Sequence, residues 1–158
     1  MIKLLNKTEF PKIRNHSPKI FFIDAQNKVL GRLATQIAKS LMGKENAFYQ
    51  QGIDQGNFVI VLNAKKVFVS GKKENKKFYY RNSQRPGSLK KESLKNLRER
   101  IPARILEEAI WGMLPKGVLG RNYYKRLYVY NNEEIIYKKN KKVSIFLKTF
   151  LHKNAIIL

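Results

Sequence analysis

Two apolar runs separated by an amphipathic segment dominate the first part of the chain. Residues 19–24 form an aromatic and β-branched run and residues 58–62 are continuously apolar, so both predict buried strands. Between them, apolar residues recur at the helical spacing i, i+3, i+4, i+7, at Leu30, Leu33, Ala34, Ile37, Ala38 and Leu41. Gly43 is expected to end this helix, and Asp24 and Asn27 offer oxygens to cap its start. A helix between two strands predicts a parallel α/β unit.

The following region alternates short extended pieces with turns. We expect extended structure at residues 67–69 and 78–80, with a turn at Pro86-Gly87. A short basic helix is predicted over residues 119–127, before extended structure resumes at residues 127–130. These elements predict an α/β sandwich with a small, mostly parallel sheet.

Two further helices are predicted between these extended pieces. The first spans residues 92–100, and the second has Pro102 in its first turn and stops before Pro115. Their inward positions are predicted to be Leu94, Leu97 and Ile101 for the first, and Ile105, Leu106, Ala109, Ile110 and Met113 for the second.

The charge of the chain indicates what kind of partner it binds. The 158 residues include 33 Lys and Arg against 11 Asp and Glu, a formal net charge of +22. Such an excess repels itself in a compact domain unless a polyanion neutralises it. Acidic proteins or anionic membranes could serve, but no stretch approaches the roughly 20 apolar residues of a membrane span. The basic residues are also spread along the whole chain, which favours a nucleic acid.

The residues for catalysis or metal binding are sparse. The chain has no cysteine, and its two histidines, His16 and His152, lie far apart near the termini. Asp24 and Asp54 are its only aspartates, and we interpret them as a cap and a turn residue. Gly71-Lys72 lacks the preceding glycine and following Ser or Thr of a phosphate-binding loop. We therefore predict no catalytic residue, no metal site, no cofactor and no small-molecule substrate.

The strongest binding signal lies between Lys65 and Lys91, where ten Lys or Arg face one acid, Glu74. Residues 78–80 place three aromatics among these cations. Cations neutralise phosphates and aromatics stack on exposed bases, so this region predicts RNA contact, although Phe78 itself is expected in the core. The loop of residues 115–121 opens a basic helix and could be a phosphate site or an ordinary interhelical turn.

Several motifs in a fixed order resemble a known family. They are Ile23-Asp24-Ala25 with Val29-Leu30-Gly31-Arg32-Leu33-Ala34, Phe58-Val59-Ile60-Val61-Leu62-Asn63-Ala64 with Val67, Ser70-Gly71-Lys72-Lys73, Tyr79-Tyr80-Arg81, Arg85-Pro86-Gly87 with Leu89-Lys90, Arg100-Ile101-Pro102, and Gly112-Met113-Leu114-Pro115-Lys116 with Leu119-Gly120-Arg121. Together they resemble large-subunit ribosomal protein thirteen of the bacterial and organellar type, over residues 21–130.

The resemblance implies a three-layer α/β/α sandwich in a core domain of residues 20–130. The charge of the terminal segments predicts basic extensions over residues 1–19 and 131–158. It implies no catalytic activity, and a structural role in binding large-subunit rRNA beside other ribosomal proteins, supporting subunit assembly and translation. The resemblance and the charge pattern together predict these rRNA-binding residues: Arg32, Lys39, Lys65, Lys66, Lys72, Lys73, Lys76, Lys77, Tyr79, Tyr80, Arg81, Arg85, Lys90, Lys116, Arg121, Lys125 and Arg126.

The chain also departs from the family pattern. Where the family usually has Pro-His before Asp-x-Gly-Asp, residues 51–57 read Gln-Gly-Ile-Asp-Gln-Gly-Asn. A usual His-Ser-Gly is Asn-Ser-Gln at residues 82–84, and a Lys-rich tail stands in place of the usual His-Pro-His ending. This divergence, with abundant Lys, Asn and Ile typical of AT-rich genes, suggests a ribosome of an organelle, plastid or mitochondrion, with a bacterium as the alternative. The basic N-terminal segment lacks the apolar region of a secretory signal, and a targeting role for it stays open.

Overall fold

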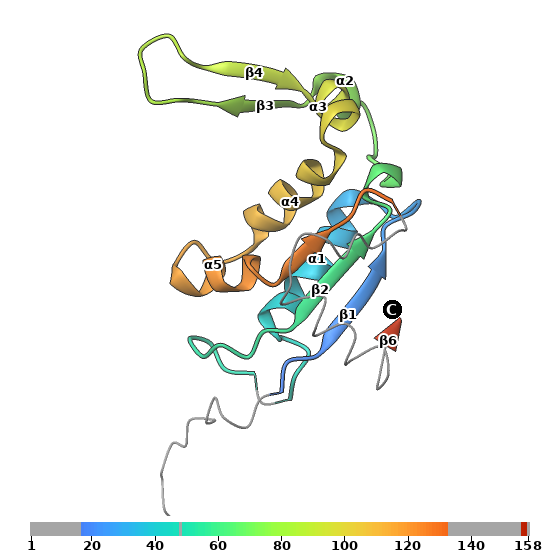
Figure 1. Ribbon diagram of the computed structural model, residues 1–158, viewed down its shortest axis with the longest axis vertical. Helices are drawn as coiled ribbons and strands as arrows, with labels where there is room; N and C mark the ends of the chain where they lie inside the picture. Colours follow the sequence, from blue (N-terminus) through green and yellow to red (C-terminus); the bar gives the residue numbers. More distant parts are fainter. Residues whose placement is uncertain (1–16, 48, 133–155, 158) are drawn as a thin grey trace, which may run out of the picture.

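The computed structural model describes residues 17–47, 49–132 and 156–157 (Figure 1). Its main sheet has four parallel strands in the order β5-β2-β1-β6. The strands are β1 (Ile20–Asp24), β2 (Phe58–Leu62), β5 (Leu127–Val129) and β6 (Ile156–Ile157). β1 and β2 pair along their whole length. The predicted α/β class with a small parallel sheet is confirmed.

Helices α1 (Leu30–Met42), α4 (Pro102–Met113) and α5 (Val118–Tyr124) lie on one side of this sheet. α3 (Leu94–Arg100) packs on α4, and the short α2 (Lys73–Lys76) packs on α3. A short helical turn, η2 (Ala64–Lys66), follows β2. The steps from β1 to β2 and from β2 to β5 run in the same direction across the sheet, so right-handed crossovers place both connections on the same face. Within the described residues, no helix is long and apolar enough to cross a membrane.

Among the described residues the helices lie on one side of the sheet, so these residues form two of the three layers that the resemblance implies. Most of the two basic extensions, with His16 and His152, lies outside the described residues.

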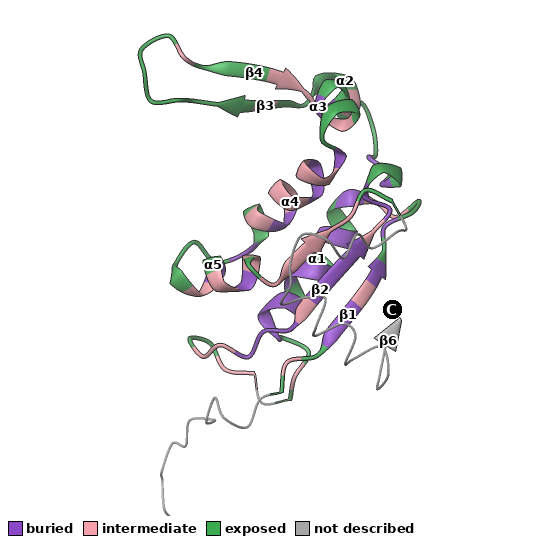
Figure 2. Cartoon of the chain, viewed as in Figure 1, coloured by how far each residue is buried: buried purple, intermediate pink, exposed green. Residues whose placement is uncertain are grey.

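The two apolar runs predicted as strands bury side chains on both faces of the sheet. Ile23 and Val61 point into the main core with α1 and α4, whereas Ile20 and Ile60 form a smaller cluster on the other face. Figure 2 shows this burial along the central strands and the inner sides of the helices. Burial on both faces explains why β2 is continuously apolar.

The start of α1 differs from the predicted capping. Gly43 ends the helix with a φ of 73°, as expected, but residue Val29 at its start supplies no side-chain cap. Instead, the backbone N–H of Leu30 donates to the carbonyl oxygen of Phe68 at 2.9 Å, in the extended segment predicted at residues 67–69. The prediction of Asp24 as a helix cap is wrong.

Asp24 instead ties β1 to the turn after β2. Its Oδ1 accepts hydrogen bonds from the side-chain amide of Asn63 at 2.9 Å and from the backbone N–H of Gln26 at 3.0 Å. The bond from Asn63, followed by that from Gln26, lowers the pKa of the Asp24 carboxyl.

Two predicted helix boundaries are wrong. Residues 90–93 form a strand, β4, and α3 begins only at Leu94, where the Ser93 hydroxyl accepts from the Asn96 N–H at 3.3 Å. α5 ends at Tyr124, not at residue 127, because the carbonyl of Arg126 already accepts a bond from Val59 in the sheet. In both places strand pairing overrides local helical spacing.

The inward pattern of α3 and α4 is largely confirmed, with two errors. Ile101, in the break between the helices, is 38% exposed, and Met113, the last residue of α4, is 42% exposed. Helix ends leave the face that the periodic pattern continues, so both side chains reach the surface.

Gly120 allows α5 to pack against the loop before it, and its replacement tests that packing. A Cβ there would collide with the carbonyl oxygen of Pro115, so Gly120→Ala should lower the free energy of unfolding by about 1–3 kcal/mol. Gly117→Ala is the matched control, because a Cβ there meets nothing within 4 Å. Urea denaturation measures both, and equal stability of the two variants would contradict the close approach.

Candidate nucleic-acid interface

A two-stranded antiparallel arm brings many of the predicted contacts together. β3 (Phe78–Arg81) pairs with β4 (Lys90–Ser93), and the arm extends away from the main sheet (Figure 1). Figure 2 shows it almost entirely exposed. Its exposed cations are Lys77, Arg81, Arg85, Lys90 and Lys91. A surface of this shape can enter a groove or crevice of a folded partner.

Short polar side chains order the tip of the arm. Asn82 Oδ1 accepts from the Ser88 hydroxyl at 2.7 Å and from the backbone N–H of Gln84 at 2.9 Å. Gln84 and Gly87 adopt positive φ values of 64° and 72°, which close the turn predicted at Pro86-Gly87. Arg85 is therefore held at the exposed tip of a defined loop.

The aromatics of β3 divide between its two faces. Phe78 and Tyr80 share one face and are 38% and 59% exposed, so the prediction of Phe78 in the core is wrong. Lys91 from the paired strand lies with its Nζ 3.9 Å from the centre of the Phe78 ring. Tyr79 points the other way and packs against the core, where burial, with a smaller effect from Glu108, raises the pKa of its phenol. Strict alternation along the strand could have separated these positions.

Arginine–carboxylate pairs fix the base of the arm and the helices next to it. Arg98 of α3 donates to Glu74 of α2 at 2.8 Å and to the carbonyl oxygen of Val67 at 2.7 Å. Arg100 binds both oxygens of Glu92, at 2.7 and 3.1 Å, across the base of the arm. Sequence reasoning missed these positioning residues, because nothing local marks them.

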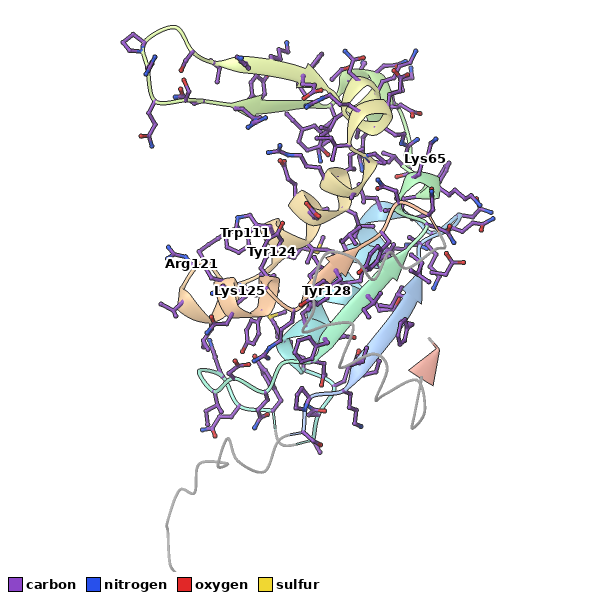
Figure 3. All side chains as sticks on the ribbon, viewed as in Figure 1. Lys65, Trp111, Arg121, Tyr124, Lys125 and Tyr128 are labelled. Atoms are coloured by element: carbon purple, nitrogen blue, oxygen red, sulfur yellow. The ribbon has the colours of Figure 1, made fainter. Side chains whose placement is uncertain are left out.

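A second basic surface lies where α4 meets α5. Lys116 donates from its Nζ to the carbonyl oxygen of Trp111 at 2.9 Å, and the Trp111 ring meets that of Tyr124 edge to face at 5.2 Å. Arg121 and Lys125 are exposed on the neighbouring helix and its end (Figure 3). The structure thus brings three predicted cations beside two partly buried aromatics.

Arg126 has a structural role instead. Its guanidinium nitrogens reach the two carboxylate oxygens of Asp54 at 2.7 and 2.6 Å, and one also donates to the carbonyl oxygen of Gly56 at 2.9 Å. The side chains of the ion pair are only 24% and 22% exposed. A phosphate at this site would have to compete with Asp54.

The other predicted cations are exposed and lie on several elements of the fold. Arg32 and Lys39 belong to α1, Lys65 and Lys66 to η2, and Lys72, Lys73 and Lys76 to α2 and its start. In Figure 3, Lys65 lies apart from the cluster around Arg121. A partner that touched all these positions would have to follow several sides of the protein.

Acidic groups do not assemble into a metal site in the described part of the chain. No three His, Cys, Asp or Glu side chains there could hold one ion together.

Comparison with known proteins adds a family match. The ribosomal protein L13 family profile matches residues 18–135. A protein named large ribosomal subunit protein uL13 from a Synechococcus strain is 48% identical over 130 residues, 82% of this chain and 87% of the relative. One with the same name from a Cyanothece strain is 46% identical over 145 residues, 92% of this chain and 97% of the relative. A Prochlorococcus marinus relative, also named uL13, is 48% identical over 130 residues, 82% of this chain and 91% of the relative.

The contrast between Arg126 and Arg85 gives a test of the two roles. Arg126→Ala leaves the partly buried Asp54 without its partner and should lower the free energy of unfolding by about 1.5–3 kcal/mol. Arg85→Ala, at the exposed tip, should change it by less than about 0.5 kcal/mol. Chemical denaturation distinguishes the two. An Arg126→Ala variant as stable as the wild type would contradict the structural role of Arg126 and make it a candidate RNA contact again.

Proposed function

The chain belongs to the ribosomal protein L13 family of the large ribosomal subunit, and we propose that it binds large-subunit rRNA there as a structural component, without catalysing a reaction. The β3–β4 arm and the α4–α5 surface are the main contacts in this proposal. Through them the protein would support assembly of the subunit beside neighbouring ribosomal proteins.

The arm is the observation that carries this proposal. Between Arg81 and Lys91 the chain has four cations and no acid, on a narrow projection that also exposes Phe78 and Tyr80. Cations neutralise phosphates and release counterions, and exposed aromatics stack on unpaired bases. A projection with so little apolar burial and so much like charge gains most when it is surrounded by a polyanion.

The proposed contact residues are the predicted ones that the fold leaves exposed. They are Arg32, Lys39, Lys65, Lys66, Lys72, Lys73, Lys76, Lys77, Tyr80, Arg81, Arg85, Lys90, Lys116, Arg121 and Lys125, to which we add Phe78. Tyr79 and Arg126 are left out because the core and Asp54 engage them.

The absence of catalysis is proposed from how the chain uses its carboxylates. Asp24 is engaged by Asn63 and Asp54 by Arg126, so neither aspartate is free for acid–base chemistry. Burial raises the pKa of Glu107, but the adjacent Glu108 is bonded to Arg104 at 2.9 Å. These arrangements serve stability.

We further propose that the protein belongs to a plastid ribosome, with a bacterial ribosome as the alternative. The relatives described above are cyanobacterial, and plastids derive from cyanobacteria. The Lys-, Asn- and Ile-rich composition is typical of an AT-rich, reduced genome.

Sedimentation tests whether the protein is an integral ribosomal component. An extract is centrifuged through a gradient at high salt, and the protein is followed by mass spectrometry. We expect it to stay with the large subunit, because an integral protein is enclosed by folded rRNA as well as held by phosphate contacts, which alone would weaken at high salt. Release into the soluble fraction with the subunit intact would show a peripheral RNA binder and contradict the proposal.

Charge reversal at the tip tests the arm. Arg85→Glu should weaken binding to a large-subunit rRNA transcript about tenfold and reduce the salt slope of log affinity by about 0.7–0.9 for each phosphate that the variant no longer neutralises. Its melting temperature should not change, because Arg85 is exposed. Lys44→Glu makes the same charge change at an exposed position after α1 and is the control. Equal binding by the two variants would remove Arg85 from the interface.

A further inference from the structure

A groove between α1 and α4 lies outside the arm and the α4–α5 surface. It has a volume of about 980 Å³ and reaches α2 and the start of the arm. We call it the α1–α4 groove. We call its apolar lining residues the floor; they are Val29, Leu30, Val69, Leu94, Ala109 and Met113. Its size is within the range of natural ligand sites, about 300–1,000 Å³.

The rim of the α1–α4 groove is strongly basic. Arg32, Lys72, Lys73, Lys76 and Lys77 line it. Its one acidic lining residue, Glu108, is bonded to Arg104 at 2.9 Å. An apolar floor below an almost uncompensated cationic rim fits a ligand that has both an apolar face and negative charge.

The floor includes apolar surface that the fold leaves open. Met113 is 42% exposed, and its sulfur lies 3.6 Å from the Thr35 hydroxyl oxygen, whose shorter hydrogen bond goes to the carbonyl oxygen of Gly31 at 3.0 Å. Thr35 also lines the groove. A polarisable thioether beside a hydroxyl suits an aromatic ring that carries polar edges.

Two glycines in the groove wall have no role in the packing of the described residues. Gly31, in the first turn of α1, and Gly112, near the end of α4, both line the groove. A Cβ at either position would meet nothing within 4 Å, and neither has a positive φ. Alanine would suit a helix at least as well. Glycine at both positions is explained if something outside the chain approaches these helices closely.

We propose that the α1–α4 groove binds an unpaired nucleotide of rRNA, with the base on the apolar floor and the flanking phosphates on the lysine rim. The inference rests on the proposed function and adds a subsite to it. Unstacked bases in loops and bulges are the usual targets of sequence-specific RNA binding. A nucleotide joins a flat ring to a phosphate, which matches the two parts of the groove.

An acidic peptide of a neighbouring protein is the competing occupant. Its carboxylates would suit the lysine rim, but its side chains do not require two bare helix surfaces. A planar base can approach the backbone of a helix closely where no side chain stands between them, so the glycines beside the floor favour the nucleotide.

The most direct test places side chains at the two glycines of the groove wall and leaves every charge in place. Gly112→Ala and then Gly112→Leu, with the same pair at Gly31, should leave the melting temperature of the free protein unchanged or slightly higher. They should progressively weaken binding to a large-subunit rRNA transcript, with the leucine variants about fivefold to a hundredfold weaker, the range for loss of one stacked base. Gln36→Leu, on exposed surface of α1 outside the groove, is the control and should bind normally.

Met113→Ala provides a second test at an exposed position, in case a leucine variant fails to fold. It should weaken binding in the same assay, and ultraviolet cross-linking of the wild-type complex should attach a nucleotide to a groove residue.

Three outcomes would contradict the proposal. If all groove variants bind rRNA normally while Arg85→Glu binds weakly, the groove subsite is overturned and the proposed function stands. If the groove variants bind the transcript normally but do not enter large subunits, the groove binds an acidic peptide of a neighbouring protein, and the nucleotide proposal is overturned. A wild-type protein that does not bind the transcript would overturn both proposals.

Discussion

The apolar contact between the central strands and the layer of α1 and α4 is the interaction on which the rest of this structure depends. The chain has a formal net charge of +22, and mutual repulsion among its cations opposes every compact arrangement. Burial of Ile23, Val61, Ile37 and Ile110 in one core supplies the opposing free energy, because apolar burial does not depend on charge. Once that core exists, the cations can be displayed outward, on the arm, around the groove and beside α5, without unfolding the domain.

Carboxylates are too scarce to neutralise this surface, and the fold uses them as ties. Asp54 fixes the segment before β2 to Arg126 before β5, Glu74 fixes α2 to α3, and Glu92 fixes the arm to the end of α3. Each tie holds together two elements that strand pairing or helix packing alone would leave loosely joined. In the described residues each of these acids is held by an arginine, and the exposed cations far outnumber the remaining carboxylates, so the surface stays positive.

The parts of the fold that could be predicted from sequence are those whose periodic pattern is local. β1, α1 and β2 were predicted nearly to the residue because each presents a full period of apolar positions and Gly43 marks a stop. β4 was missed because it is a strand only through its pairing with β3. Likewise the sequence could not separate Arg126 from the exposed cations, since its partner Asp54 is 72 residues away. The candidate contacts were predicted by charge, but which of them are free is decided by tertiary pairing.

Arginines and lysines have different roles in this protein, because their charged groups differ in geometry. Each of the four ion pairs in the described residues is made by an arginine, from Arg98, Arg100, Arg104 or Arg126. The planar guanidinium forms two directed bonds at once, so it suits fixed internal geometry. The rim of the groove carries mainly lysines, whose compact charge on a flexible stem can follow phosphates in many positions. A groove that is rigid in its floor and glycine wall but adaptable in its rim would select the shape of a base while tolerating variation in the backbone around it. Recognition of one extruded nucleotide within a large folded RNA needs both a fixed surface for the base and adaptable charges for the phosphates. The proposed groove has both, because the core, the arginine ion pairs and the glycine surfaces do not involve the rim lysines.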